Sequence, residues 1–148
     1  MKKLIKILSL FCLIVLATAC NEKNIDLSKV YTNLDSEYSG FNKLDKDSLE
    51  GIYGVDTSKF DDYIVVIDNT SNKGSMYAVF KAKDNDFDTA DYEAEYFIDK
   101  YKDSWSLNYF PEETKLVNDG VKEIYGDFII FVVNKNQDTI ISKIKNSK

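Results

Sequence analysis

The chain has 148 residues, which suits one domain of ordinary size, and it contains 19 lysines, 25 acidic residues, two cysteines and one proline. It contains no histidine and no arginine. The missing histidine excludes Ser-His-Asp and Cys-His catalytic pairs and imidazole ligands for a metal ion. The missing arginine excludes a bidentate clamp for phosphate or carboxylate groups.

The first 19 residues have the pattern of a secretory signal peptide. Three lysines (Lys2, Lys3 and Lys6) make the start positive, an apolar stretch follows as far as Leu16, and small residues at 17–19 precede Cys20. The apolar stretch is shorter than the roughly 20 residues that a transmembrane helix needs. We therefore predict export rather than a membrane-spanning segment.

The segment from Leu16 to Cys20 resembles the lipobox of bacterial lipoproteins. The resemblance implies that the Cys20 thiol receives a diacylglycerol and that residues 1–19 are removed. It also implies that the protein stays on the extracytoplasmic face of the cell membrane. Ala17 stands where leucine is commonest in a lipobox, and an ordinary secretory signal followed by an unrelated cysteine is the alternative. Two acyl chains on one residue would anchor the protein stably.

Removal of the signal would leave residues 20–25 as the lipidated cysteine and tether, and residues 26–148 as a single domain. This shortened chain of 129 residues has a net charge of −9 and no free thiol once Cys20 carries lipid. The charge argues against nucleic acid, whose binding depends on lysine and arginine neutralising phosphates. We expect the bilayer, through Cys20, and an envelope protein or glycan as partners, and no cofactor.

Two helices are predicted at the start of the domain. Apolar residues recur at helical spacing after Asp26, which would cap the first helix; they are Leu27, Val30, Tyr31, Leu34 and Tyr38. A second helix is predicted from about Ser48 to Tyr53. Asp47 and Glu50 resemble a capping box before it, and Gly54 stands where a C-terminal cap is wanted.

Two strands and a long helix follow. Tyr63–Ile67 and Met76–Ala82 are rich in apolar and β-branched residues, and the polar segment 68–74 between them reads as a hairpin loop. Apolar residues at helical spacing predict a helix from Thr89 to Ser104, capped by Asp88 or Thr89. Pro111 prevents this helix from continuing and opens one short turn.

The end of the chain predicts a second hairpin and a last helix. Val121–Tyr125 and Phe128–Val133 flank the turn dipeptide Gly126-Asp127, and a helix begins at about Gln137. The run Phe128–Val133 is apolar on both faces, which indicates a central strand. The predicted fold is α+β: a single antiparallel sheet of about four strands with helices on one face, in the order αα-ββα-ββα.

Several segments together resemble the domain-of-unknown-function (DUF) family 4358. They are Ile52–Asp56, Ala78–Asp84, Ser104-Trp105 with Tyr109, Pro111–Glu113 and Tyr125–Phe128. The likeness spans about Leu49 to Lys143, although Trp105 stands where the family usually has Phe and Asp127 where Asn is common. The resemblance implies a small, lysine-rich lipoprotein of low-GC Gram-positive bacteria, and it carries no assigned reaction.

A calcium loop is one candidate site. Asp84, Asp86, Asp88 and Glu95 occupy positions 1, 3, 5 and 12 of the EF-hand spacing. Position 6 is Thr89 where the turn needs glycine, and the preceding segment reads as a strand. An acidic helix start, favoured by the helix dipole, is the simpler interpretation, and we assign no metal ligands.

A pair of carboxylates is a second candidate, with Glu112 or Glu113 as one member. Glycoside hydrolysis needs two carboxyl groups facing each other across a cleft. With 25 acidic residues, chance pairs are certain, so an acidic surface is the simpler interpretation. We assign no catalytic residue, and a small hydrolase acting on envelope polymers stays an alternative, as does a weak metal-binding module.

An aromatic patch is the third candidate. Trp105, Tyr109 and Phe110 cluster before Pro111, where exposed rings could stack on a sugar or anchor a protein. The competing interpretation is that these rings belong to the core, since Trp105 continues the apolar stripe of the long helix. We expect a non-catalytic binding or accessory module of the cell envelope.

Overall fold

Five antiparallel strands form one sheet in the computed structural model, which describes residues 23–68, 70, 73–106 and 110–148. The strands are β1 (Asn42–Lys43), β2 (Phe60–Ile67), β3 (Met76–Ala82), β4 (Val121–Tyr125) and β5 (Phe128–Val133), in the spatial order β1-β2-β3-β5-β4. The central strands β3 and β5 are buried along their whole length except at Lys81. Their apolar residues point to both faces because helices cover both faces of the sheet there.

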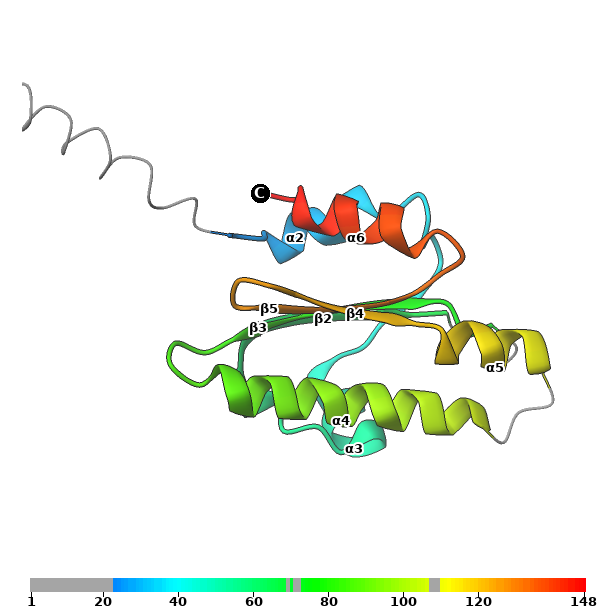
Figure 1. Cartoon of the computed structure of the whole chain (residues 1–148), viewed down its shortest axis with the longest axis horizontal. Helices are drawn as coiled ribbons and strands as arrows, with labels where there is room; N and C mark the ends of the chain where they lie inside the picture. Colours follow the sequence, from blue (N-terminus) through cyan, green and yellow to red (C-terminus); the bar gives the residue numbers. More distant parts are fainter. Residues whose placement is uncertain (1–22, 69, 71–72, 107–109) are drawn as a thin grey trace, which may run out of the picture.

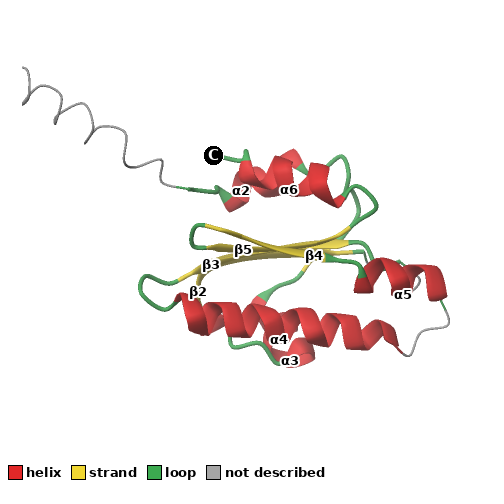
Figure 2. Ribbon diagram, viewed as in Figure 1, coloured by secondary structure: helices red, strands yellow, loops and turns green. Residues whose placement is uncertain are grey.

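Helices cover both faces of this sheet. On one face lie α2 (Leu27–Asn33) and α6 (Gln137–Lys145); on the other lie α3 (Lys46–Tyr53), the 3₁₀ turn η1 (Thr57–Lys59), α4 (Phe87–Ser106) and α5 (Pro111–Asn118). Figure 2 shows the sheet between the two helical layers. Alternate residues of β5 enter the two cores: Ile129, Phe131 and Val133 pack toward α4, while Phe128, Ile130 and Val132 pack toward α6.

The prediction of helices on one face is therefore wrong. A strand that is apolar on both sides needs cover on both sides, and α2 and α6 provide it on the second face. The sheet also has five strands rather than about four. The additional strand, β1, has two exposed residues that pair with Ile67 and Val66, and its sequence carries no apolar run to signal it.

Most of the other predicted elements are confirmed, with changes at their ends. The bounds of β3, β4 and β5 are those expected, whereas β2 begins at Phe60, three residues earlier than expected. Helix α4 extends the expected helix at both ends, and the turn expected after Pro111 is the eight-residue helix α5. The two predicted hairpins pair in register, with Ile67 opposite Met76 and Tyr125 opposite Phe128.

Helix caps follow the sequence at two of four positions; Asp88 and Thr89, expected to cap the long helix, lie inside α4, which begins at Phe87. The Asp26 side chain accepts hydrogen bonds from the backbone N–H groups of Ser28 and Lys29, and Gly54 ends α3 with a left-handed φ of 72°. The start of α3 differs from expectation because Asp45, rather than Asp47, caps it by accepting a bond from the Ser48 N–H. Asp47 lies instead in the first turn, where its charge suits the helix dipole.

The two ends of the domain are joined to each other. The Asp26 N–H donates to the Ser147 carbonyl at 2.7 Å, and the Asn33 amide donates to the Ser147 hydroxyl at 2.9 Å. As far as the structure describes the chain, both hydrophobic cores consist of residues between Ile25 and Ile144, which the segment 21–148 includes. Among the described helices, none is long and apolar enough to cross a membrane.

The core of the α4 layer should be sensitive to truncation of Phe97, which is fully buried and contacts Phe80, Tyr53 and Tyr101. We expect Phe97→Ala to lower the free energy of unfolding by about 3–5 kcal/mol, because it leaves a cavity. Tyr92→Ala on the same helix removes a side chain that is 68% exposed, so we expect a change within about 0.5 kcal/mol. Urea unfolding of residues 21–148, followed by circular dichroism, measures both; equal losses would contradict the packing described.

Candidate functional site

The end of the molecule around α5 contains two of the sequence candidates. Here the C-terminal part of α4, helix α5 and the loop between β2 and β3 meet, at the opposite end of the sheet from the β4–β5 hairpin (Figure 1). We call this region the α5 end and define it by Gly74, Tyr101, Trp105, Phe110 and Glu113. It contains Trp105 and Phe110 of the aromatic candidate and Glu113 of the carboxylate candidate.

The structure separates the three aromatic residues of the expected patch. Trp105 is only 7% exposed and belongs to the core cluster under α4, because it continues the buried stripe of Ile98 and Tyr101. Phe110, just before α5, is 41% exposed. Tyr109 lies outside the described residues. Trp105 is therefore a core residue rather than part of an exposed patch, and Phe110 is the exposed described member of the three.

Gly74 fixes the β2–β3 loop against the helices of the α5 end. Its N–H donates to the Glu113 carboxylate at 2.9 Å, and its carbonyl accepts a hydrogen bond from the Tyr101 hydroxyl at 3.0 Å. A Cβ atom at position 74 would lie 2.3 Å from a methyl group of Val117, so only glycine fits there. The sequence marks Gly74 as a loop residue but contains no signal of this close contact.

Glu113 has structural partners. Besides the Gly74 N–H, its carboxylate lies 3.5 Å from the Lys73 ammonium, while the neighbouring Glu112 is exposed. Burial raises the pKa of Tyr101, so the hydroxyl of that residue stays protonated and acts as a donor. The contacts of Glu113 thus close the loop onto α5, and the partners of its carboxylate are the Gly74 N–H and the Lys73 ammonium rather than a second carboxyl group.

The Asp84–Glu95 segment does not form a calcium loop. Helix α4 begins at Phe87, so the last nine of the twelve positions are helical. Glu95 forms an ion pair with Lys122 of β4, and Asp91 lies 2.6 Å from the same ammonium. Across the described part of the chain, no group of three or more Asp, Glu, Cys or His side chains is arranged to hold a metal ion.

Lys122 is the centre of a charge cluster that the sequence pattern does not reveal. Burial lowers the pKa of Lys122, but its hydrogen bonds to Asp91 and Glu95 outweigh burial and raise this pKa overall. The spacing of the two acids by four residues places them on one side of α4, which the sequence does show. The pairing of that side with β4 depends on the sheet order and cannot be read from spacing.

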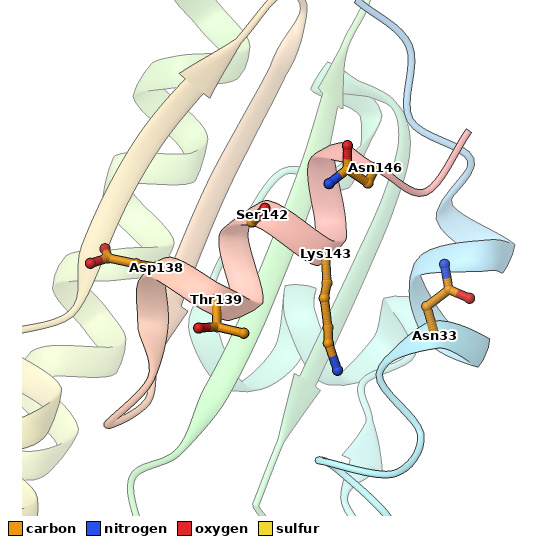
Figure 3. A pocket seen from close by; sticks show the side chains of 6 residues that line it. All are labelled: Asn33, Asp138, Thr139, Ser142, Lys143 and Asn146. Atoms are coloured by element: carbon orange, nitrogen blue, oxygen red, sulfur yellow. The ribbon is translucent and has the colours of Figure 1, made fainter.

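One hollow lies between α2 and α6. It has a volume of about 590 Å³ and is lined by Asn33, Asp138, Thr139, Ser142, Lys143 and Asn146. Figure 3 shows that these side chains fan out along α6 and across to α2, so that Asp138 and Lys143 point in different directions. Lys143 is engaged by an ion pair with Glu37. The hollow is open, and its polar side chains do not converge on a common point.

Comparison with known proteins shows which family this domain belongs to. The fold is an α+β domain whose antiparallel sheet is covered on both faces, and the sequence model of the domain of unknown function DUF4358 matches residues 34–134. The chain belongs to this family. The matched segment contains all five strands and α3, α4 and α5, whereas α2 and α6 lie outside it. No curated protein and no solved structure matches the chain.

Replacing Glu113 should test its structural role. Glu113→Ala leaves the buried Gly74 N–H without an acceptor, so we expect a loss of about 1–3 kcal/mol in the free energy of unfolding. Glu113→Gln keeps an oxygen acceptor and should cost less. Urea unfolding measures these differences, and amide exchange at Gly74 should be faster in the alanine variant. The matched control is Glu112→Ala at the neighbouring exposed position; an equal effect of both alanine variants would contradict the assignment.

Proposed function

We propose that this protein is a lipoprotein held on the extracytoplasmic face of the cell membrane by Cys20, and that its domain is a non-catalytic binding or accessory module of the cell envelope. The signal pattern and the lipobox-like segment before Cys20 support the anchor. Cys20 itself and the signal residues lie outside the described residues. The assignment of the chain to DUF4358 carries no biochemical activity with it.

The short tether supports a domain that lies close to the bilayer. Ile25 is already buried in the core and Asp26 caps α2, so only residues 21–24 separate Cys20 from the fold. Four residues span at most about 14 Å when fully extended. The Lys23 ammonium lies over the Tyr125 ring, 5.2 Å from its centre, which places the start of the described chain beside the β4–β5 hairpin.

The observation that favours binding is the exposed Phe110 at the α5 end. The chain enters the domain near the β4–β5 hairpin, whereas α5 lies at the far end of the sheet (Figure 1). An exposed aromatic ring on a rigid support is a common anchor for a protein or a sugar. The support is rigid here because Gly74, Glu113 and Tyr101 join the adjoining loop to the helices. We propose an envelope protein or glycan as the partner.

Catalysis is the weaker alternative on chemical grounds. A chain without histidine or arginine has few ways to activate a nucleophile or to stabilise a charged transition state. The remaining candidates were a carboxylate pair at Glu112 or Glu113 and a metal site from Asp84 to Glu95. The Glu113 carboxylate is bound by the Gly74 N–H and the Lys73 ammonium. Most of the segment from Asp84 to Glu95 is helical. Neither arrangement favours a hydrolase or a metal-binding module over a binding domain.

The anchor is tested by Cys20→Ser. We expect this variant either to appear in the medium or to remain as an uncleaved precursor, because the thiol that accepts the lipid is missing. Fractionation of the cells, gel mobility and labelling with a fatty-acid analogue distinguish these results from the wild type. Cys12→Ser is the matched control and should stay anchored. Unchanged membrane association, mobility and lipid labelling of Cys20→Ser would show that the lipobox interpretation is wrong.

The binding surface is tested by Phe110→Ala with cross-linking on intact membranes. We expect the cross-linked product of the wild type to be lost in Phe110→Ala and retained in Tyr92→Ala, which removes an exposed ring from α4 instead. The free energy of unfolding of both variants should lie within about 1 kcal/mol of the wild-type value. Turnover of peptidoglycan or an ester by the domain, abolished by Glu113→Gln, would instead establish the hydrolase.

A further inference from the structure

Among the described residues, no strand pairs with the outer edge of β4, and Lys23 lies beside its Tyr125 end. In this part of the chain β4 is the last strand of the sheet and pairs with β5. Helix α4 packs on β3 and β5, and α6 packs on β5, so these helices lie inward of the edge. Because Tyr125 and Phe128 close a two-residue turn, the ladder alternation points the backbone N–H and C=O groups of Lys122 and Ile124 outward. These groups can accept another strand.

The opposite edge of the sheet is protected in ways that the β4 edge is not. There, β2 is partly covered by the short strand β1, and its start carries a bulge between Phe60 and Asp62 and the exposed carboxylate of Asp62. Short strands, bulges and edge charges are the usual means of preventing edge-to-edge pairing. The register of β4 on β5 is regular, and the strand contains no proline.

The two charged residues of β4 are turned toward helices of the same chain. Lys122 is bound by Asp91 and Glu95 of α4, and Glu123 lies 2.5 Å from the Lys145 ammonium of α6. Their charges are therefore largely neutralised and do not guard the edge. The apolar Ile124 between Glu123 and Tyr125 is 44% exposed. A hollow of about 310 Å³ runs beside the strand on the α6 side, between Glu123, Tyr125 and Lys145.

We propose that two copies of this chain pair antiparallel through β4, with Ile124 of each copy at the two-fold axis. Residues opposite each other in an antiparallel pair point to the same face, so the residue on the axis meets its own copy. Lys122 or Glu123 on the axis would place like charges opposite each other, which is destabilising. Ile124 on the axis pairs two apolar side chains and sets Glu123 opposite Tyr125 of the second copy, beside the hollow.

The symmetry of this dimer allows both copies to be anchored in the same membrane. This membrane argument, unlike the strand pairing itself, rests on the proposed lipid anchor. The two-fold axis of an edge-to-edge pair is perpendicular to the sheet, so the α2 and α6 layers of both copies lie on the same side. Both chains then enter their folds from that side, where Asp26 caps α2 (Figure 1). Confinement of two tethered copies to one surface raises their effective concentration, which favours pairing through a single short strand.

Cysteine cross-linking of residues 21–148 tests the pairing independently of the anchor, because this segment contains every described core residue and no cysteine. We expect Ile124→Cys to be converted mainly to a disulfide-linked dimer under mild oxidation. Ile52→Cys on α3, which is 74% exposed, is the matched control and should remain monomeric. Cross-linking of Ile124→Cys no faster than the control would overturn the proposal.

Further variants test which residue lies on the two-fold axis and whether the Ile124 side chain holds the two copies together. Glu123→Cys should cross-link more slowly than Ile124→Cys; a faster reaction would overturn the Ile124 register. In light scattering at increasing concentration, the wild-type segment should approach the mass of two chains and Ile124→Lys the mass of one, with Ile52→Lys behaving like the wild type. Circular dichroism should show that these exposed substitutions keep the fold. A concentration-independent monomer in the wild type would also overturn the proposal, whatever the result for Cys20→Ser.

Discussion

The structure depends on one constraint, which is that the central strand β5 is apolar on both of its faces. Six consecutive buried residues place three side chains toward α4 and three toward α6, so each face of the sheet needs its own helical layer. The family segment 34–134 supplies α3, α4 and α5 on one face. The second face is covered by α2 and α6, which come from the two ends of the domain and contact each other.

Much of the secondary structure follows from the sequence because it depends on local patterns. The spacing of apolar residues and the residues of the turns determine three such elements: the hairpin around Gly126-Asp127, the strand Met76–Ala82 and the helix from Gln137. The layer arrangement was missed although the doubly apolar run Phe128–Val133 pointed to it, since periodicity does not show which helix packs on which face. The strand β1 was missed because two polar residues carry no pattern at all.

The candidate site was less predictable because its contacts join distant parts of the chain. The carboxylate of Glu113 meets Gly74 across 39 residues, and Lys122 meets Glu95 across 27. Neither pairing has a spacing signal. The burial of Trp105 did follow from helical spacing, which had already placed it on the core stripe with Tyr101. By contrast, the signal-like pattern before Cys20 can be read directly from the sequence, because it depends on local composition alone.

The order of the strands also governs when the domain can assemble. β3 ends at Ala82, but its second neighbour is β5, which begins only at Phe128, and helix α6, which covers one face of β5, follows at Gln137–Lys145. Until these late residues are free to fold, β3 has an unpaired side and both cores lack part of their lining. Folding must therefore wait until the residues of β5 and α6 are available, and pairing across about 50 residues makes it slower than assembly of neighbouring hairpins. A chain truncated before α6 would expose the apolar face of β5 to aggregation.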